Sequence, residues 1–449
     1  MRLAEKGEPL QGTETQDDAL ACALKNRLTI VCGGPGTGKT TAVKKILTTL
    51  LKTEPGLCFK LIAPTGKAAA RLQESLVSEN SEIQNCETST IHALICGSGD
   101  QKRPTREDPV KADVIVVDEC SMMDINLAAS LLDVIDPKAT KLILLGDRHQ
   151  LSAVGPGSIF SDLCARTAAT NNHLIELKKS FRFLDSSTIG RFARAIKENS
   201  VTDVMEVLQH PELLDGNPVH WHKKGTTFEQ GVSREAQVWL RQKLSAFLQS
   251  IRNFRFTEEN AESLLALAKS LGILCATRED PMGVEKINET IENWLEREGF
   301  QAPYFRLKII RRNDSLLGVH NGDIGLVLPI ASEEGVPYFY LGKNACFKYG
   351  LMPENETAFA ISIHQSQGSE YATVGVFMPQ DENSPLATRE LLYTAVTRVK
   401  DVAENSQTRV GDLTIFSKES VLRKAVQTAI QREGALRERL VAFKEINRD

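Results

Sequence analysis

Residues 28–40 read LTIVCGGPGTGKT, and this stretch decides the fold of the amino-terminal part of the chain. The apolar run from Leu28 to Cys32 has the length of a buried parallel strand, and a glycine-rich turn follows it directly. In such a loop backbone N–H groups turn toward phosphate oxygens, while the lysine reaches the β and γ phosphates. We therefore predict an ATP site formed by Gly33, Gly34, Pro35, Gly36, Thr37, Gly38, Lys39, Thr40 and Thr41.

A second apolar run carries two carboxylates, because Val114–Val117 is followed at once by Asp118 and Glu119. The carboxyl ends of parallel strands are where α/β sheets bind ligands, so these side chains are expected beside the phosphate loop. Acidic pairs are usually solvated, but a pair in this position fits the hydrolysis of a nucleoside triphosphate. We predict that Asp118 and Thr40 hold Mg²⁺, and that Glu119 orients and polarises the attacking water.

The order of apolar runs predicts an α/β protein with more than one domain. Four runs have the length of buried parallel strands: Leu28–Cys32, Leu61–Ala63, Val114–Val117 and Leu142–Leu145. Residues 173–271 look mostly helical, and two later runs, Ile273–Ala276 and Thr373–Met378, predict a second α/β sheet. Between these two runs, turn-separated short runs predict a small β insert, at Leu307–Ile310, Gly325–Pro329 and Tyr338–Leu341.

Composition is that of a packed enzyme of 449 residues, with 41% hydrophobic and 25% charged residues. The net charge of -4 argues against a uniformly basic surface that coats nucleic acid, although a local basic channel remains compatible with it. The 9 cysteines form no CxxC pair, which favours free thiols in a reducing compartment. No apolar run approaches the roughly 20 residues of a membrane span, so we expect a cytoplasmic protein without a membrane partner.

One residue and six stretches follow one another along the chain: Gln16, APTGKAAARL (63–72), STIH (89–92), LGDRHQL (145–151), KSFRF (179–183), SIHQSQGSE (362–370) and LYTAVTR (392–398). In this order they resemble the motifs of RecD-type superfamily 1 DNA helicases. Gln16 stands where these helicases place a glutamine that reads adenine, and the resemblance runs from Gln16 to about Phe416.

This resemblance implies two RecA-like P-loop NTPase domains with an SH3-like β insert in the second. The corresponding ranges are 1–172 for the first motor domain, 173–305 with 358–449 for the second, and 306–357 for the insert. It implies an ATP-dependent helicase acting in DNA repair or recombination, with 5′-to-3′ movement. Its expected partners are single-stranded DNA and duplex junctions.

The resemblance also assigns roles to individual residues. Gln150, Arg182 and Arg398 are expected to sense the γ-phosphate, since a guanidinium that never loses its proton suits transition-state charge. Gly368 and Glu370 are expected to contact the nucleotide. Short polar or basic side chains that grip a nucleic-acid backbone without reading bases are expected at Thr65, Lys67, Thr90, His92, Ser362 and His364.

Two departures from the family pattern and two rival functions stay open. RecD subunits carry an amino-terminal domain that docks on a partner subunit, and only a short segment precedes Gly33 here, so assembly with RecB- and RecC-like subunits stays open as a possible partnership. No cluster of Asp, Glu and Lys resembles a nuclease site apart from the ATPase residues. An RNA-directed helicase of the same superfamily is one rival, because backbone contacts discriminate weakly. An ATP-dependent DNA-binding switch without unwinding is the other.

Overall fold

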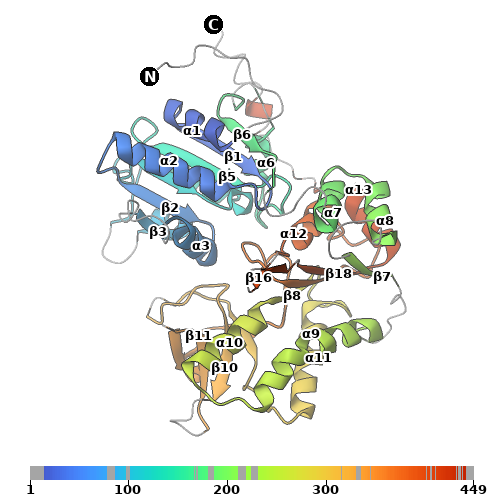
Figure 1. The fold of residues 1–449 in the computed structure, drawn as a ribbon. Coiled ribbons are helices and arrows are strands. Elements are labelled where there is room, and N and C mark those ends of the chain that lie inside the picture. The colour runs from blue at the N-terminus through green and yellow to red at the C-terminus, as the bar shows by residue number, and fades with distance from the viewer. Residues whose placement is uncertain are drawn as a thin grey trace. The chain divides into compact units, whose positions relative to one another are not determined.

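The computed structural model describes residues 15–77, 86–97, 102–165, 167, 170–180, 187–210, 219–223, 231–314, 316–329, 335–343, 345–400, 402–404, 407–409, 411–430, 432, 436 and 438–440. The chain divides into two compact units, residues 1–184 with 431–449 and residues 185–430. Each unit has its own parallel sheet with helices packed on it (Figure 1).

The first unit is built on a six-stranded parallel sheet with the order β3-β2-β4-β5-β1-β6. The strands are β1 (Leu28–Gly33), β2 (Phe59–Ala63), β3 (Cys86–Thr90), β4 (Val114–Val117), β5 (Lys141–Gly146) and β6 (Leu174–Leu177). This order places β5 between β1 and β4. The chain segments that follow these three strands therefore emerge side by side at one edge of the sheet.

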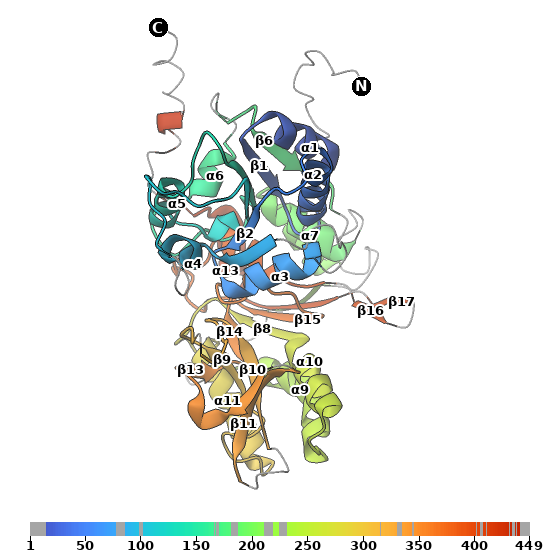
Figure 2. The same cartoon turned by 90° about the vertical axis from the view of Figure 1, so that its left-hand side faces the viewer.

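Alternating strand residues pack on opposite faces of this sheet, as the two-residue period of a strand requires. Val31 lies in a core with residues of three helices, whereas Ile30 and Cys32 lie in a second core with residues of three others. The first face is covered by α1 (Gln16–Lys25), α2 (Lys39–Thr53) and α3 (Gly66–Val77). The opposite face is covered by α4 (Ile91–Cys96), α5 (Ile125–Asp133) and α6 (Ile159–Leu163) (Figure 2).

The second unit has a five-stranded parallel sheet with the order β14-β8-β15-β18-β7. Its strands are β7 (Val219–His222), β8 (Leu271–Cys275), β14 (Ala360–Ser362), β15 (Thr373–Phe377) and β18 (Asp412–Phe416). Its helices are α7 (Thr188–Lys197), α8 (Val201–Gln209), α9 (Arg234–Arg252), α10 (Glu258–Lys269), α11 (Val284–Arg297), α12 (Arg389–Val396) and α13 (Glu419–Gln427). A short hairpin pairs β16 (Val402–Glu404) with β17 (Gln407–Arg409).

Helix α9 lies close against the second sheet. Its buried residues include Leu240, Leu244, Phe247 and Ile251, which recur at helical spacing. The Trp239 ring lies so near β15 that a Cβ added to Gly375 would stand 2.3 Å from it. Trp239 also donates an indole hydrogen bond to Thr414 of β18 at 3.0 Å. A side chain at Gly375 would therefore force the helix away from the sheet.

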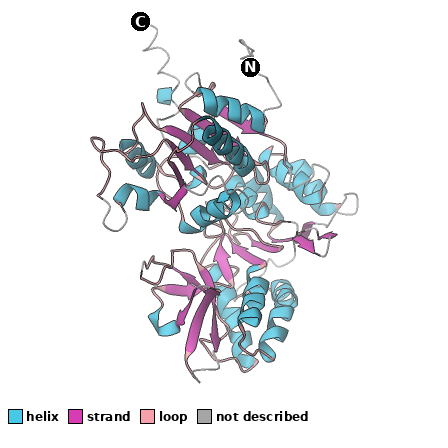
Figure 3. Cartoon of the chain, turned by 60° about the vertical axis from the view of Figure 1, so that its left-hand side comes forward, coloured by secondary structure: helices cyan, strands magenta, loops and turns pink. Residues whose placement is uncertain are grey.

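A five-stranded antiparallel sheet is inserted in the second unit between β8 and β14, with the order β12-β11-β10-β9-β13. Its strands are β9 (Leu307–Ile310), β10 (Ile324–Pro329), β11 (Pro337–Gly342), β12 (Ala345–Lys348) and β13 (Asn355–Thr357). Helix α10 packs against β10 and β11, and Tyr340 donates a hydrogen bond to Glu262 of that helix at 2.9 Å. In Figure 3 the strands of the insert stand beside helices of the same unit.

The strands predicted from the sequence lie at the expected positions, and the structure contains further strands that the sequence did not suggest. The four predicted runs of the first sheet correspond to β1, β2, β4 and β5, and the three runs of the insert to β9, β10 and β11. Strand β6 pairs with β1, so the first sheet extends beyond the expected domain end at residue 172. Among the described residues, no helix is long and apolar enough to cross a membrane.

Candidate nucleotide and DNA site

The phosphate loop joins β1 to α2 and is held in place by its own polar groups. Gly38 caps α2 with φ 83, in the left-handed region that favours glycine. Thr37 Oγ1 donates to the Gly34 carbonyl at 2.9 Å. Lys39 Nζ donates to the carbonyls of Gly33 at 2.7 Å and Gly34 at 3.1 Å. The lysine side chain therefore folds back over the loop. A bound phosphate would have to replace the two carbonyls as the partner of its ammonium group.

Asp118 and Glu119 follow β4, and the charge of Lys39 acts on the pKa of Asp118. Burial raises the pKa of Asp118 to about 6; the neighbouring carboxylate of Glu119 adds to this effect, whereas Lys39 opposes it. Glu119 has φ 51, a left-handed backbone conformation that is uncommon for a residue with a side chain. Strained backbone of this kind often marks a functional position, where the surrounding structure holds it.

Gln150 and Gln16 are brought to the same loop region by different elements. Gln150 follows β5, the strand between β1 and β4, and its Nε2 donates to Asp147 at 3.2 Å. Among the described residues, its Oε1 is a buried oxygen without a hydrogen-bond partner. Gln16 begins α1, and its Nε2 donates to the Gly38 carbonyl at 3.4 Å. The structure thus gathers Gln16, Lys39, Asp118, Glu119 and Gln150 at one edge of the first sheet.

The residue types at this edge fit a nucleotide with a divalent metal. Asp118 offers a carboxylate and Thr40, in the first turn of α2, a hydroxyl, and both are the hard oxygen donors that such cations take. The first turn of an α-helix leaves backbone N–H groups without partners inside the helix, so the start of α2 suits a phosphate. Ser180 adds a contact that the sequence did not assign, since its hydroxyl donates to the Pro35 carbonyl at 3.1 Å.

The DNA-contact candidates of the first unit lie at the ends of β2 and β3, beside the nucleotide edge. Thr65 Oγ1 accepts from the Ala68 N–H at 3.2 Å, and Thr90 Oγ1 accepts from the Ala93 N–H at 3.1 Å. Both hydroxyls therefore support the starts of helices α3 and α4. Lys67 lies in the first turn of α3, and His92 is exposed on α4.

The candidates of the second unit gather after β14. Ser362 ends this strand, and its hydroxyl donates to Gln365 Oε1 at 3.0 Å. Gly368 has φ 70, and Glu370 lies 3.8 Å from the ammonium of Lys400. Among the other candidates there, His364 is half-buried.

Of the two arginines predicted to sense the γ-phosphate, the structure describes Arg398. Arg398 is buried, and it donates from Nε to the Thr394 carbonyl at 3.0 Å and from NH1 to the Ser369 carbonyl at 3.4 Å. Arg398 thus contacts the segment that contains Gly368 and Glu370. Arg182 lies outside the described residues.

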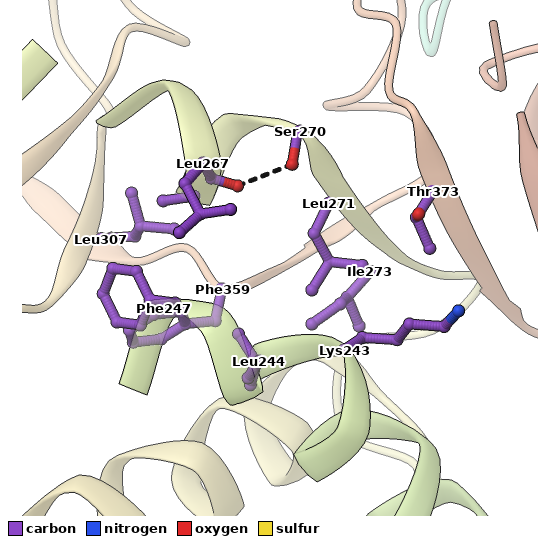
Figure 4. Close-up of a pocket in the computed structure, with 11 residues that line it drawn as sticks. Lys243, Leu244, Phe247, Leu267, Ser270, Leu271, Ile273, Leu307, Phe359 and Thr373 are labelled. Atoms are coloured by element: carbon purple, nitrogen blue, oxygen red, sulfur yellow. Dashed lines mark hydrogen bonds between the residues drawn. The ribbon is translucent and has the colours of Figure 1, made fainter. Parts of the chain in front are cut away.

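A small cavity of about 60 Å³ lies elsewhere in the second unit, between α9, α10 and β8 (Figure 4). Its lining is mainly apolar, with Leu244, Phe247, Leu267 and Phe359 among the side chains. The Ser270 hydroxyl donates to the Leu267 carbonyl at 2.7 Å. The size and lining fit a packing void and not a nucleotide site.

A phosphate loop after β1, an acidic pair after β4 and a buried glutamine after β5 define the first unit as a P-loop ATPase. The profile of the AAA domain matches residues 11–217, and the profile of the UvrD-like helicase C-terminal domain matches residues 357–401. A forked-DNA complex of Pif1 helicases has the same fold, with a TM-score of 0.51 at 18% identity over 98% of both chains. The α/β architecture with two RecA-like domains is therefore confirmed.

Curated relatives identify the family. The chain is 34% identical to RecBCD enzyme subunit RecD of Mycolicibacterium smegmatis, over 96% of this chain and 75% of the relative. It is 30% identical to the same subunit of Haemophilus influenzae, over 96% and 72%. It is also 28% identical to the ATP-dependent RecD2 DNA helicase of Deinococcus radiodurans, over 87% and 48%. The chain belongs to the RecD family and is an ATP-dependent DNA helicase that uses a divalent metal.

Proposed function

We propose that the protein moves 5′ to 3′ along single-stranded DNA and opens duplexes that carry a 5′ single-stranded tail, in DNA repair or recombination. The pair of neighbouring clusters on the first sheet supports ATP-driven movement on DNA, and the direction is what the resemblance of residues 63–72 and 362–370 to RecD implies. The residues proposed to bind the nucleotide follow β1, β4 and β5, whereas those proposed to contact the DNA backbone follow β2 and β3. ATP-driven changes at one cluster can thus alter grip at the other within a single sheet.

In the ATP cycle we assign one role to each residue. Lys39 exchanges its loop carbonyls for the β and γ phosphates, and Gln16 reads the adenine. Asp118 and Thr40 would hold Mg²⁺, which supplies charge neutralisation between the phosphates. Glu119 orients and polarises the attacking water, and Gln150 responds to the γ-phosphate. We also propose nucleotide contacts for Arg182, Arg398, Gly368 and Glu370.

We propose that the protein holds the DNA along which it moves through backbone contacts at Thr65, Lys67, Thr90, His92, Ser362 and His364. Hydroxyls, imidazoles and ammonium groups grip phosphate and sugar without selecting bases, which suits movement along any sequence. The proposed motor domains are the ranges expected from the sequence, 1–172 and 173–305 with 358–449, except that β6 (Leu174–Leu177) belongs to the first. Residues 306–357 form the proposed insert.

Single-stranded DNA and duplex junctions are the proposed partners. The relatives from M. smegmatis and H. influenzae are named as subunits of a RecBCD enzyme, so RecB- and RecC-like subunits are candidate protein partners. Co-expression with such subunits followed by size-exclusion chromatography tests this, and separate elution of the chain would contradict it.

Two otherwise identical duplexes, one with a 5′ tail and one with a 3′ tail, test the proposed polarity. With ATP and Mg²⁺ we expect strand displacement from the 5′-tailed duplex. Preferential opening of the 3′-tailed duplex would contradict the polarity and leave the helicase activity standing. A Lys39→Ala protein serves as the control for ATP-independent melting.

A further inference from the structure

The carboxylate of Glu356, in strand β13 of the insert, joins three separate segments of the second unit. Its Oε2 accepts from Arg278 NH2 at 2.9 Å, and Arg278 follows β8. Its Oε1 accepts from Gln365 Nε2 at 2.9 Å, and Gln365 follows β14. Arg311, which follows β9, lies 3.6 Å from the same oxygen through NH1. One side chain therefore connects the insert to loops at the end of two parallel strands.

Gln365 passes this connection on to Ser362. Its Oε1 accepts from the Ser362 N–H at 2.9 Å and from the Ser362 hydroxyl at 3.0 Å. A carboxylate can only accept hydrogen bonds, so the amide must turn its nitrogen toward Glu356 and its oxygen toward Ser362. The Ser362 hydroxyl also accepts from the Gln365 N–H at 3.2 Å. The direction of the Ser362 hydroxyl is thus set by an amide whose own orientation Glu356 determines.

Strand pairing and hydrogen bonds of the neighbouring residue hold Glu356 in place. Strand β13 pairs with β9, with Glu356 opposite Ile309 and Thr357 opposite Lys308. Thr357 accepts from Lys308 Nζ at 2.9 Å and donates to Glu292 of α11 at 2.6 Å, which ties the strand to that helix. Burial acts to raise the pKa of Glu356, but hydrogen bonds from Arg278 and Gln365 outweigh it and hold the pKa below its ordinary value. The carboxylate is therefore charged at neutral pH.

We propose that Glu356 is a positioning residue that couples the β insert to DNA binding by orienting Ser362 through Gln365. Ser362 is one of the residues proposed to contact the DNA backbone, so this inference rests on the DNA contact assigned to it above. Glu356 itself touches neither DNA nor nucleotide. A shift of the insert would move Glu356, rotate the amide and change the grip of the loop after β14.

The first test compares Glu356→Ala with Glu354→Ala, which removes an exposed carboxylate two residues away. We expect the Glu356 variant to bind a fluorescent oligothymidine about tenfold more weakly, the size of effect that losing one charged hydrogen bond produces. The ATPase rate without DNA and the KM for ATP should stay at the wild-type level. A merely structural role would weaken DNA binding, lower the ATPase rate and raise the KM for ATP together.

A second test exchanges the two side chains and stays informative if Glu356→Ala does not fold. In Gln365→Glu two carboxylates face one another, so DNA binding should weaken. In the double variant Glu356→Gln with Gln365→Glu, the new amide can donate to the new carboxylate. We expect the double variant to bind oligothymidine more tightly than Gln365→Glu alone.

The outcomes separate this inference from the function on which it rests. A wild-type protein whose ATPase rate DNA does not stimulate would contradict the proposed DNA contacts. A DNA-stimulated wild type with equal affinities for Glu356→Ala and Glu354→Ala would overturn the coupling alone. So would an exchange variant that binds no better than Gln365→Glu.

Discussion

Lys39 and Glu119 should fail in different ways when they are replaced. Lys39→Ala removes the cation that neutralises phosphate charge, so ATP affinity and turnover should both fall. Glu119→Gln keeps the shape and removes the base, so ATP should still bind while kcat falls by roughly 10² to 10⁴. Nucleotide-binding fluorescence and phosphate-release rates distinguish the two. Normal turnover in Glu119→Gln would show that the catalytic assignment is wrong.

Asp118 should make the metal-free protein less stable as pH rises. Its pKa is about 6 in the folded protein against 3.8 for an ordinary aspartate, so the folded state holds the proton more tightly than the unfolded chain does. The free energy of unfolding is therefore unaffected below about pH 4 and falls as the pH rises from there through about 6. By pH 8 the cost is roughly 3 kcal/mol at most, since each tenfold difference in proton affinity contributes about 1.4 kcal/mol.

The variant Asp118→Asn should remove this cost, because an amide need not ionise. Urea unfolding of nucleotide-free protein should show the variant more stable than wild type at pH 8 and similar to it near pH 4. Asp133→Asn, which changes an exposed carboxylate, is the matched control. A wild type as stable as the variant at pH 8 would mean that Asp118 ionises there without cost.

At the scale of elements, the insert can be removed where β9 and β13 lie side by side. Lys308 and Thr357 are partners in that antiparallel pair, so a short turn can join them in place of residues 309–356. This design keeps the buried Arg306 and Leu307. We expect the shortened protein to keep most of its basal ATPase and lose most of its strand displacement.

Measurements of both activities on one preparation of the shortened protein decide the matter. Circular dichroism and thermal unfolding should show that the second sheet is retained. Equal loss of ATP hydrolysis and unwinding in a folded protein would count against a DNA-gripping role for the insert.

At the scale of the whole molecule, Arg398 is the residue of the second unit that we expect to act on the γ-phosphate. In the structure it donates to carbonyls of its own unit, Thr394 and Ser369, so it must exchange these partners for phosphate oxygens. Arg398→Ala should lower kcat by roughly 10³ to 10⁵, as for other arginine fingers. Arg398→Lys should not rescue the rate, because an ammonium cannot fork onto two oxygens.

Single-turnover hydrolysis, with ATP binding measured separately, would check this effect. The same assay with DNA and RNA oligonucleotides compares the two nucleic acids as activators. An unchanged kcat in Arg398→Ala would remove this residue from the γ-phosphate site and leave the first-unit assignments as they are.

The sequence by itself determined the parts of the site whose residues are neighbours in the chain. The phosphate loop and the acidic pair each follow an apolar run directly, and a backbone of fixed geometry leaves few ways to arrange adjacent residues. The strands β1, β2, β4 and β5 were predictable for the same reason. The short strands β6, β13 and β14 were not, because polar residues interrupt their runs, which therefore lack the unbroken apolar pattern that marks β4 as a buried strand.

Only the tertiary structure decided which distant residues meet. Strand order puts β5 between β1 and β4, and with it Gln150 between the phosphate loop and the acidic pair. Burial by the surrounding fold, rather than any local motif, raises the pKa of Asp118 to about 6. The contact between Glu356 and Gln365 crosses from an antiparallel to a parallel sheet. Such contacts depend on how whole elements pack, and packing is a property of the assembled core that no short stretch of chain encodes alone.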